Sequence, residues 1–534
     1  MSTLPAPRGP FLLRDELLEY AAECGIDYSE LLDGSRGTSN WQQRDILNAW
    51  HTLGMYVDFA IETVPGNPSL RALWTWADID HAARFAEFAA AHACDDDPLH
   101  RGVRFLEGVW DYLERDALAG TPRGAIIAAF ADAMRASNYA KPPTLAFVQP
   151  VLTRYLAPLL FEGNKDLAAQ FDVYMFEGAT TGAAVAAQSL VRAGLLKPGD
   201  KVALLWPSYE PFQDLFCTQH GLEAVHIWRD PANDWEPCPG EFEKLLDPAV
   251  KVYVSVSPGN PVPVTASAKA IAELKAVAEK RPDLLIFSDH VYAHFLDEPL
   301  DAEIKHLPRQ TLAFYSLSKD FALAGARAGV MLVHKDTVID DMLAARDPEQ
   351  ARAADAVYAT RASDVMSFLF IRRVAVDSRW VSFSHMSGMA TPIQALVCLA
   401  AAFDGAFPEE SKAYFKWVAE TMKSRLVALY DALGLPVSDV VRDHSSRYSA
   451  LLDLRDIARA HYGEEGVARL EVIGPTPVFR HIVKQYRAVV VPGQPFGGSE
   501  YSFRVCLPFL TEAQYRRIGE SVKSAVDDVV NAER

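Results

Sequence analysis

The sequence predicts an α/β protein that combines a large domain, built on a mainly parallel sheet, with a smaller α+β domain. Apolar strand patterns alternate with helical patterns from about residue 170 to residue 333, which is typical of βα units. After about residue 380 this alternation weakens. The length of 534 residues suits two or three domains, and an apolar content of 50% is enough for sizeable cores.

Charge, cysteine usage and hydropathy exclude several classes of protein. The formal net charge of −18 argues against nucleic acid or an anionic membrane as the main partner, so an anionic ligand needs local basic groups. The six cysteines form no CxxC pair and have no metal-ligand spacing, and we predict no metal site. The amino terminus lacks an apolar signal segment, and the longest apolar runs are too short to span a bilayer. We therefore expect a soluble cytoplasmic protein.

The amino-terminal part reads as helices separated by polar turns. Helical periodicity covers residues 11–24 and 41–61, and several more helices are expected between residues 80 and 135. The turn between the first two helices contains Arg36 and Gly37. The Arg36 guanidinium can reach an anion from this turn, and an arginine that is simply solvated in a loop is the alternative.

A proline-bearing loop follows at residues 137–143. Its prolines cannot continue a helix. The phenol of Tyr139 is therefore expected to be available for contact.

The first strand, turn and helix of the large domain have the features of a phosphate site. A strand is predicted at 173–176, a turn at 177–182 and a helix at 183–193. Such a turn aims backbone N–H groups and threonine hydroxyls at an anion. The turn matches neither a Walker loop nor a dinucleotide fingerprint, so an ordinary turn is the alternative.

Polar residues follow the next three strands, which we place at 201–206, 251–257 and 284–288. Tyr209 and Asn260 come after the first two, where a tyrosine ring either stacks on a planar heterocycle or packs in the core. Asp289 and Tyr292 come after the third. An ionised carboxylate after so apolar a strand is costly unless a cation meets it.

A lysine between two serines follows the strand predicted at 311–315. Ser316, Ser318 and Lys319 lie just beyond this strand, where open α/β sheets bind their ligands. A partly desolvated lysine amine can bind a cofactor aldehyde, and Arg327 can hold a phosphate through its planar guanidinium. A surface lysine and arginine are the alternative for this segment alone. Five strand ends thus predict one cofactor site at one side of the sheet.

The carboxy-terminal part reads as the smaller domain, with helices at 391–404 and 409–433 and strands near 448–453 and 487–491. Arg504 lies in a later strand among apolar neighbours. A partly buried arginine needs a carboxylate partner, which is either a substrate or an internal acidic residue.

We expect four segments in the chain. They are an amino-terminal segment that contributes to the small domain (1–65), a helical insertion (66–135), the large domain (136–385) and the small domain (386–534).

Six stretches carry a resemblance to a known family. They are RGTSNW at 36–41, SPGNP at 257–261, RPDLLIFSDHVY at 281–292, YSLSK at 315–319, VAVDSR at 374–379 and YSFRV at 501–505. As a set they resemble the fold-type I pyridoxal-phosphate enzymes of the aspartate aminotransferase superfamily. The aspartate 4-decarboxylase branch is the most similar part of that superfamily, and the resemblance runs through most of the chain.

The resemblance implies a role for each residue at the cofactor ring. Lys319 is similar to the lysine that binds the cofactor aldehyde and moves protons, and Asp289 to the carboxylate that keeps the pyridine nitrogen protonated. Tyr292 and Asn260 resemble the groups on the ring oxygen. Tyr209 resembles the aromatic residue stacked on the ring.

The resemblance also implies a phosphate cup and a substrate clamp. The cup would consist of Gly178, Ala179, Thr180, Ser316, Ser318 and Arg327. Arg504 is similar to the clamp on the substrate α-carboxylate, and Arg36 with Gly37 to a further substrate-binding element. Tyr139 is similar to a catalytic tyrosine lent across a dimer interface. A homodimer or a larger assembly of dimers with shared active sites is implied.

The implied reaction is removal of the 4-carboxylate of L-aspartate to give L-alanine and carbon dioxide, with or without side aminotransferase activity. Several positions depart from the branch pattern. They are His290, 293–294, Asp320, Ala326 and 384–392. Three alternatives therefore stay open: an aminotransferase, a paralogue that acts on another acidic amino acid, and a cofactor-binding protein without turnover.

Overall fold

The computed structural model describes residues 9–64, 66–71, 76–137, 144–359, 364–379, 389–437 and 444–532. The chain divides into two compact units. The first unit comprises Met1–Asn40, Leu196–Thr311 and Phe415–Arg534, and the second comprises Trp41–Leu195 and Leu312–Tyr414. The segment boundaries expected at residues 65, 135 and 385 stay a prediction.

The main strands form an eight-stranded mixed sheet with the order β4-β11-β10-β9-β8-β5-β6-β7. Their bounds are β4 Phe171–Phe176, β5 Lys201–Trp206, β6 Glu223–Asp230, β7 Glu236–Pro237, β8 Val250–Val256, β9 Leu285–Asp289, β10 Thr311–Tyr315 and β11 Gly329–His334. Strands β6, β5, β8 and β9 pair in parallel, whereas β11 pairs antiparallel with both β4 and β10. The α/β class predicted from the sequence is confirmed.

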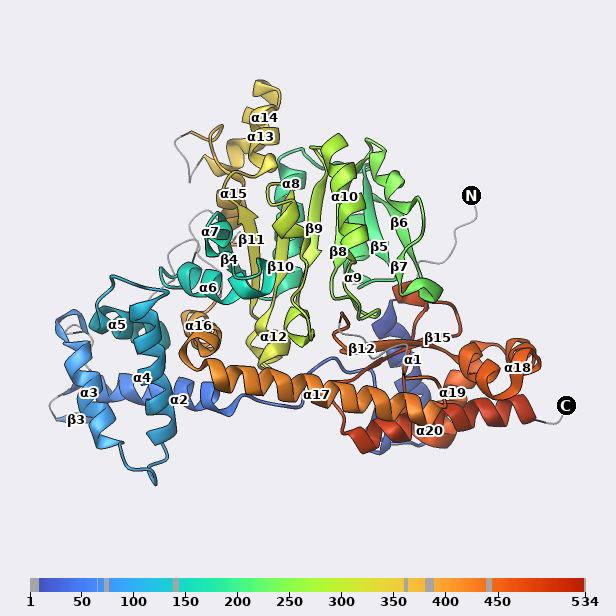
Figure 1. Ribbon diagram of the computed structural model, residues 1–534. Coiled ribbons are helices and arrows are strands. Elements are labelled where there is room, and N and C mark those ends of the chain that lie inside the picture. Colours follow the sequence, from blue (N-terminus) through green and yellow to red (C-terminus); the bar gives the residue numbers. More distant parts are fainter. Residues whose placement is uncertain are drawn as a thin grey trace. The chain divides into compact units, whose positions relative to one another are not determined.

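In the first unit, helix α10 (Ala268–Lys280) covers the parallel strands (Figure 1). Its apolar stripe, which includes Leu274 and Val277, packs in one buried cluster with Tyr253 of β8 and Ile286 of β9. Ser267 caps the helix by accepting a hydrogen bond from the N–H of Ala270. This packing holds the carboxyl ends of β5, β8 and β9 in register.

The rest of the first unit joins the two ends of the chain. Its elements are α1 Pro10–Glu23, β1 Leu32–Asp33, α9 Pro211–Gln213, α11 Glu303–His306, β12 Ser449–Asp453, α18 Leu454–Ile473, α19 Pro475–Tyr486, β13 Ala488–Val489, β14 Val491–Pro492, β15 Ser502–Cys506 and α20 Glu512–Asn531. Strand β1 pairs in parallel with β13, and β12, β15 and β14 form a three-stranded antiparallel sheet. The amino-terminal segment is therefore built into the small carboxy-terminal sheet and its helices.

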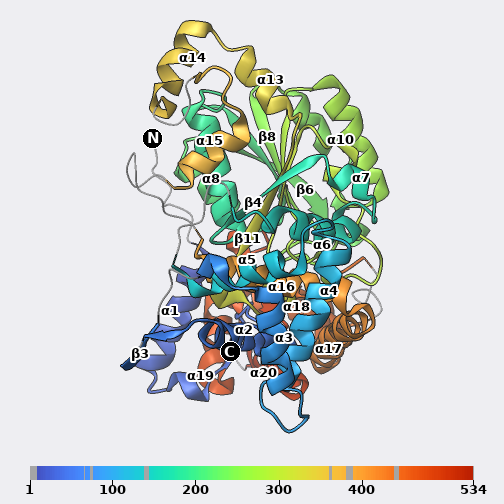
Figure 2. The same ribbon diagram turned by 90° about the vertical axis from the view of Figure 1, so that its left-hand side faces the viewer.

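The second unit contains most of the remaining helices. Its elements are α2 Arg44–Ala60, β2 Thr63–Val64, β3 Asn67–Arg71, α3 His81–Ala91, α4 His100–Arg115, α5 Arg123–Arg135, α6 Val148–Leu160, α7 Lys165–Ala168, α8 Ala179–Arg192, α12 Leu317–Asp320, α13 Val338–Ala344, α14 Pro348–Asp355, α15 Phe370–Asp377 and α16 Thr391–Ala406. Figure 2 shows α2, α3, α4 and α5 grouped together. Aromatic side chains fill this group: Phe105 stacks on Phe407 at 5.0 Å, and Trp110 meets Phe130 edge to face at 5.2 Å.

Helix α17 (Pro408–Leu433) continues from α16 into the first unit. No single helix among the described residues is long and apolar enough to cross a membrane. By length and composition alone, α16 and α17 pass that test as a pair bent by 105°.

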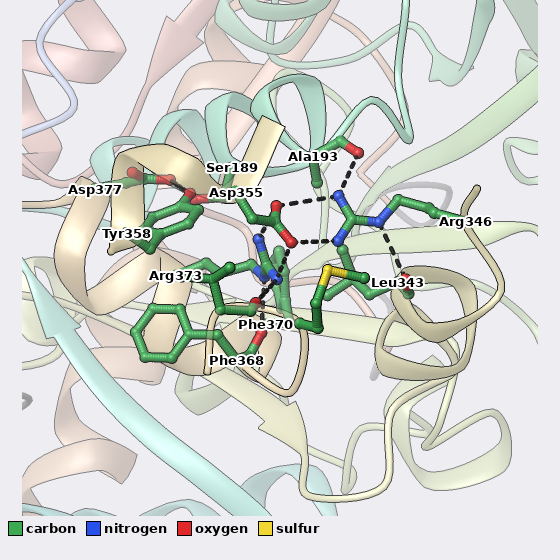
Figure 3. A network of polar contacts seen from close by, with 12 residues as sticks. Ser189, Ala193, Leu343, Arg346, Asp355, Tyr358, Phe368, Phe370, Arg373 and Asp377 are labelled. Carbon is green, nitrogen blue, oxygen red and sulfur yellow. Dashed lines mark hydrogen bonds and ion pairs between the residues drawn. The ribbon is translucent and has the colours of Figure 1, made fainter. Parts of the chain in front are cut away.

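A buried charge network fixes helices α14 and α15 in the second unit (Figure 3). The carboxylate of Asp355 binds Arg373 and Arg346, with Nη2 distances of 2.8 and 2.6 Å to Oδ2. Asp377 accepts hydrogen bonds from Ser189 and Tyr358 nearby. Buried carboxylates are stable only when paired in this way.

Candidate active site

In the first unit, the parallel register brings the ends of β8 and β9 together. Val256 is the partner of Asp289, and the N–H of Ser257 donates to the carbonyl of Asp289 at 2.9 Å. Asn260 therefore lies at the same edge as Asp289. Tyr209 follows the end of β5 at this edge, as predicted, and its ring is half-buried.

A chain of hydrogen bonds links three of the predicted residues. The Asn260 amide donates from Nδ2 to the Tyr292 hydroxyl at 3.3 Å, and its Oδ1 accepts from Arg504 Nη1 at 3.4 Å. Because the Tyr292 oxygen accepts from Asn260, its own proton is directed elsewhere. This arrangement leaves the phenol as a donor for a ligand oxygen.

Burial raises the pKa of the Tyr292 phenol well above its ordinary value. Tyr209 and Asp289 lie near enough to add to this rise, whereas Arg504 opposes it. Tyr292 is therefore neutral near pH 7 and keeps its proton. Asp289 is 5% exposed, and its Oδ1 accepts from the N–H of Val291 at 3.1 Å.

Arg504 is a buried cation with no carboxylate partner among the described residues. It projects from β15, donates to the carbonyl of Ser35 at 3.2 Å and lies 4.5 Å from the ring centre of Phe496. Its Nε is buried without a hydrogen bond. The alternative prediction, a salt bridge between Arg504 and an internal acidic residue, does not form among the described residues. A buried guanidinium with spare donors is suited to an anionic ligand.

The predicted substrate element at Arg36 and Gly37 begins one residue after Ser35. The Arg36 side chain is exposed, and its guanidinium lies 4.5 Å from the ring centre of Phe509. The carbonyl of Gly37 accepts a hydrogen bond from Tyr448 at 3.0 Å. The loop that carries Arg36 is thus fixed close to Arg504.

Sequence reasoning missed Tyr448, which is 1% exposed. Its ring packs on Tyr292 at 4.7 Å, and its hydroxyl also lies 3.2 Å from Ser39 Oγ. It connects the loop of Gly37 to the phenol of Tyr292. Tyr448 lies just before β12, and no sequence motif predicts its contacts with residues so distant in the chain.

Sequence reasoning also missed Glu303, which contacts Ser288, the residue before Asp289. It is 1% exposed and accepts from Ser255 and Ser288 at 2.6 and 2.7 Å. The Nδ1–H of His290 donates to the carbonyl of Ser257 at 2.8 Å. These contacts hold the carboxyl ends of β8 and β9 together.

In the second unit, the antiparallel register of β11 brings together the ends of β4 and β10. Gly329 is the partner of Phe176, and Val330 is the partner of Tyr315. The residues that follow β4 and β10 therefore meet at one edge. Arg327 lies at the same edge, just before β11.

Within the predicted phosphate cup, the position of Gly178 favours glycine. Gly178 has φ 120°, and a Cβ there would lie 2.6 Å from Nη2 of Arg327. Helix α8 begins directly after Gly178, four residues earlier than predicted, because Gly178 rather than Gly182 ends the turn. The free N–H groups of Ala179 and Thr180 therefore belong to the first turn of a helix, which favours an anion.

Arg327 lies at this helix end. Its guanidinium donates to the carbonyls of Ala324 at 3.1 Å and Glu177 at 3.4 Å. No carboxylate of the described chain lies within ion-pair distance of Arg327. The cup therefore combines a helix amino terminus with a guanidinium, and this donor set fits a phosphate.

Lys319 lies on the short helix α12, at the edge that carries the cup. Ser316 caps this helix by accepting from the N–H of Ser318 at 3.2 Å, and it donates to the carbonyl of Ala328 at 2.7 Å. Lys319 is partly buried. The serines thus fix the turn that presents the lysine.

Two sets of predicted residues are now placed, one in each unit. The first unit holds Arg36, Gly37, Tyr209, Asn260, Asp289, Tyr292 and Arg504, and the second holds Gly178, Ala179, Thr180, Ser316, Ser318, Lys319 and Arg327. Tyr139 lies outside the described residues. The sets contain an amine, an anion cup and a carboxylate, which are the groups that pyridoxal phosphate requires.

Comparisons with known proteins agree with this assignment. The family model "Aminotransferase class I and II" matches residues 125–522. A Pseudomonas protein named "Bifunctional aspartate aminotransferase and L-aspartate beta-decarboxylase" is 32% identical over 526 residues, which is 97% of this chain and 96% of that protein.

Solved structures show the same fold. An aspartate aminotransferase double mutant from Thermus thermophilus superimposes with a TM-score of 0.59 at 18% identity, over 98% of this chain and 100% of that one. N-succinyldiaminopimelate aminotransferase from Mycobacterium tuberculosis gives 0.55 at 14% identity, over 96% of each chain. The chain therefore belongs to the class I and II aminotransferases, the fold-type I enzymes that use pyridoxal phosphate and act on amino acids.

Proposed function

We propose that this protein removes the 4-carboxylate of L-aspartate to give L-alanine and carbon dioxide, with aminotransferase activity as a side reaction. The observation that carries the proposal is Arg504, a buried cation without a carboxylate partner in the described chain, next to the loop of Arg36. The bifunctional Pseudomonas relative, which aligns with nearly the whole chain, supports aspartate as the substrate.

Arg504 would bind the substrate α-carboxylate. Its two hydrogen bonds, to Asn260 and to the carbonyl of Ser35, orient the guanidinium before substrate arrives. Such preorganisation lowers the entropic cost of aligning one chosen bond for reaction. Arg504 thus sets the orientation of the amino acid.

Arg36 would orient the side-chain carboxylate. Its guanidinium is exposed and stacked on Phe509 rather than buried. A strongly desolvated clamp would stabilise the substrate carboxylate more than the transition state in which it is lost, and would slow the reaction. An exposed arginine suits a carboxylate that must leave.

The cofactor residues would hold pyridoxal phosphate, which when bound draws electrons from the bonds of the amino acid. Lys319 would bind its aldehyde, and Asp289 would keep a proton on its ring nitrogen. Tyr292 and Asn260 would contact the ring oxygen, and Tyr209 would stack on the ring. The cup would bind the phosphate through Gly178, Ala179, Thr180, Ser316, Ser318 and Arg327.

The proposed reaction is balanced without an oxidant. Lys319 would move the proton at the substrate Cα. The bond from Cβ to the 4-carboxylate then breaks, carbon dioxide leaves, and its bonding electrons stay at Cβ. Cβ takes up one proton and becomes the methyl group of alanine.

A second candidate is an aminotransferase for aspartate or another acidic amino acid. His290 beside Asp289, and Asp320 beside Lys319, favour it because both depart from the pattern of the decarboxylase branch. A cofactor-binding protein without turnover is the remaining alternative. We also propose a homodimer or larger assembly, in which the partner subunit contributes Tyr139 as a catalytic tyrosine. A cytoplasmic location is a further proposal.

The test is to incubate purified holoenzyme with L-aspartate, with and without 2-oxoglutarate, and to measure carbon dioxide, alanine and glutamate. Carbon dioxide and alanine in equal amounts without 2-oxoglutarate support the decarboxylase. Glutamate formed only with 2-oxoglutarate, and no carbon dioxide, would support the aminotransferase instead. If no carbon dioxide, alanine or glutamate appears but the protein shows the visible absorption band of bound pyridoxal phosphate, the cofactor-binding alternative is supported.

A further inference from the structure

Asp33, the last residue of β1, is a buried carboxylate that accepts four hydrogen bonds in the first unit. The N–H of Ser35 donates to its Oδ1 at 2.9 Å, and the Ser35 hydroxyl donates to the same oxygen. Its Oδ2 accepts from Arg14 Nη2 at 2.7 Å and from the Tyr28 hydroxyl at 2.9 Å. The carboxylate therefore fixes the turn that follows β1.

Arg14 of helix α1 also binds this turn directly. Its Nε donates to Ser35 Oγ at 2.7 Å, so one planar guanidinium contacts both Ser35 and Asp33. Burial alone would raise the pKa of Asp33, but hydrogen bonds from Ser35 and Arg14 outweigh burial and lower the pKa. Asp33 is therefore ionised near pH 7, and Arg14 supplies the opposite charge.

The turn after β1 connects to both arginines that we assign to the substrate. The carbonyl of Gly34 accepts from the N–H of Cys506 at 2.8 Å, and the carbonyl of Ser35 accepts from Arg504 Nη2 at 3.2 Å. Arg36 is the next residue of the chain. The position of the turn therefore affects the side chain of Arg504 and the backbone that carries Arg36.

We propose that Asp33 is a positioning residue for substrate binding, because it fixes the Ser35 carbonyl that orients Arg504 and the backbone from which Arg36 projects. Hydrogen bonds to an ionised carboxylate are stronger than bonds between neutral groups, so the turn is held in place before substrate arrives. Asp33 would thus act on the substrate through the two arginines. The inference rests on the roles proposed above for Arg504 and Arg36.

The experiment measures the binding of succinate, which is aspartate without its amino group and cannot form an imine with the cofactor. Calorimetric titration of holoenzyme gives the succinate dissociation constant in the wild type and in Asp33→Asn. The amide keeps the shape of the side chain but loses the charge that holds Arg14 and Ser35 together. We expect the dissociation constant to rise about 5- to 30-fold.

Asp377→Asn is the matched control, because Asp377 has the same set of donors in the second unit. It accepts from Ser189 at 2.6 Å, Arg192 at 2.5 Å and Tyr358 at 2.9 Å. Both variants remove a buried charge and should lose stability in a denaturant titration. Only Asp33→Asn should lose affinity for succinate, whereas Asp377→Asn should keep the dissociation constant within about twofold.

Ser35→Ala tests the same inference with a smaller change. It removes the hydroxyl between Asp33 and Arg14 but keeps the backbone carbonyl that Arg504 contacts. We expect the succinate dissociation constant to rise about three- to fivefold.

Two outcomes separate this inference from the proposed function. If the wild type binds succinate, and Asp33→Asn and Ser35→Ala bind it equally well, the inference is overturned while the proposed function stands. If both variants bind succinate more weakly but the wild type forms no carbon dioxide from aspartate, the inference stands and the decarboxylase proposal fails.

Discussion

Arg504 and Asn260 are joined by a hydrogen bond between two buried side chains, with 3.4 Å from Nη1 to Oδ1. The other end of the same amide donates to the Tyr292 hydroxyl. The residue assigned to the substrate carboxylate is therefore coupled to the residue assigned to the cofactor ring. A change at Arg504 should affect substrate binding first and the cofactor second.

Arg504→Lys should lower kcat/KM for L-aspartate by about 10- to 100-fold, because a hydrogen bond to a charged group contributes roughly 1.5–3 kcal/mol. Lysine keeps the charge but loses the planar pair of donors. Steady-state kinetics would measure the change. Arg459→Lys, an exposed arginine paired with Glu464, is the control and should stay within about twofold. Equal effects of the two variants would contradict the assignment.

Tyr448→Phe removes the hydroxyl that donates to the carbonyl of Gly37. We expect KM for aspartate to rise about 3- to 10-fold, since one neutral hydrogen bond contributes roughly 0.5–1.5 kcal/mol. The control is Tyr430→Phe, which changes another buried tyrosine, one that forms no hydrogen bond with Gly37 in the described part of the chain. If KM is unchanged in Tyr448→Phe, the loop of Arg36 does not depend on this contact.

Most strands of the eight-stranded sheet were readily predicted from sequence, because they are short, apolar and followed by polar residues. The strand predicted at 311–315 is β10 without change, and β8 and β9 lie within one residue of their predicted ends. The strand at β6 was missed, since only two of its eight side chains are fully buried and no apolar run marks it. Strand β6 is defined by its parallel pairing with β5 rather than by its own sequence pattern.

The predicted positions of Arg504 and Lys319 in the fold are confirmed, whereas their supporting contacts were not predictable. Tyr448 and Glu303 act through partners far away in the sequence, and no local spacing reveals them. The reversal of β11 was also missed. The short connection from β10, through α12, returns the chain antiparallel and thereby places Arg327 beside Gly178.

The stability of the second unit should fall in acid because of Asp355. Burial alone would raise the pKa of this carboxyl, but Arg373 and Arg346 outweigh burial and lower it. A folded pKa below the unfolded value, about 3.9, gives stability that is present above that pH and is lost as the pH falls through the folded value. Denaturant unfolding from pH 6 to pH 2 should show this loss.

Asp355→Asn should remove that part of the acid dependence and destabilise the protein near pH 7 by roughly 3–5 kcal/mol, since the buried Arg373 and the partly buried Arg346 lose their partner. Asp58→Asn is the control, because Asp58 forms an exposed pair with Arg71, and we expect a change of less than about 1 kcal/mol. A steep acid loss that persists in Asp355→Asn would assign the effect to other carboxyls.

Gly178→Ala should weaken cofactor binding by at least about tenfold, which corresponds to roughly 1.4 kcal/mol. Its Cβ would meet Arg327 Nη2 at 2.6 Å, and φ 120° is unfavourable for alanine. Gly194→Ala, beyond the other end of α8, is the control: its φ of 74° is also positive and so disfavours alanine, but a Cβ there meets no atom within 4 Å. Gly194→Ala should therefore lose stability while keeping its affinity for pyridoxal phosphate. Titration of the apoenzymes with pyridoxal phosphate, followed by fluorescence, would measure both dissociation constants. Equal affinities in the two variants would show that the phosphate binds elsewhere than at the amino terminus of α8.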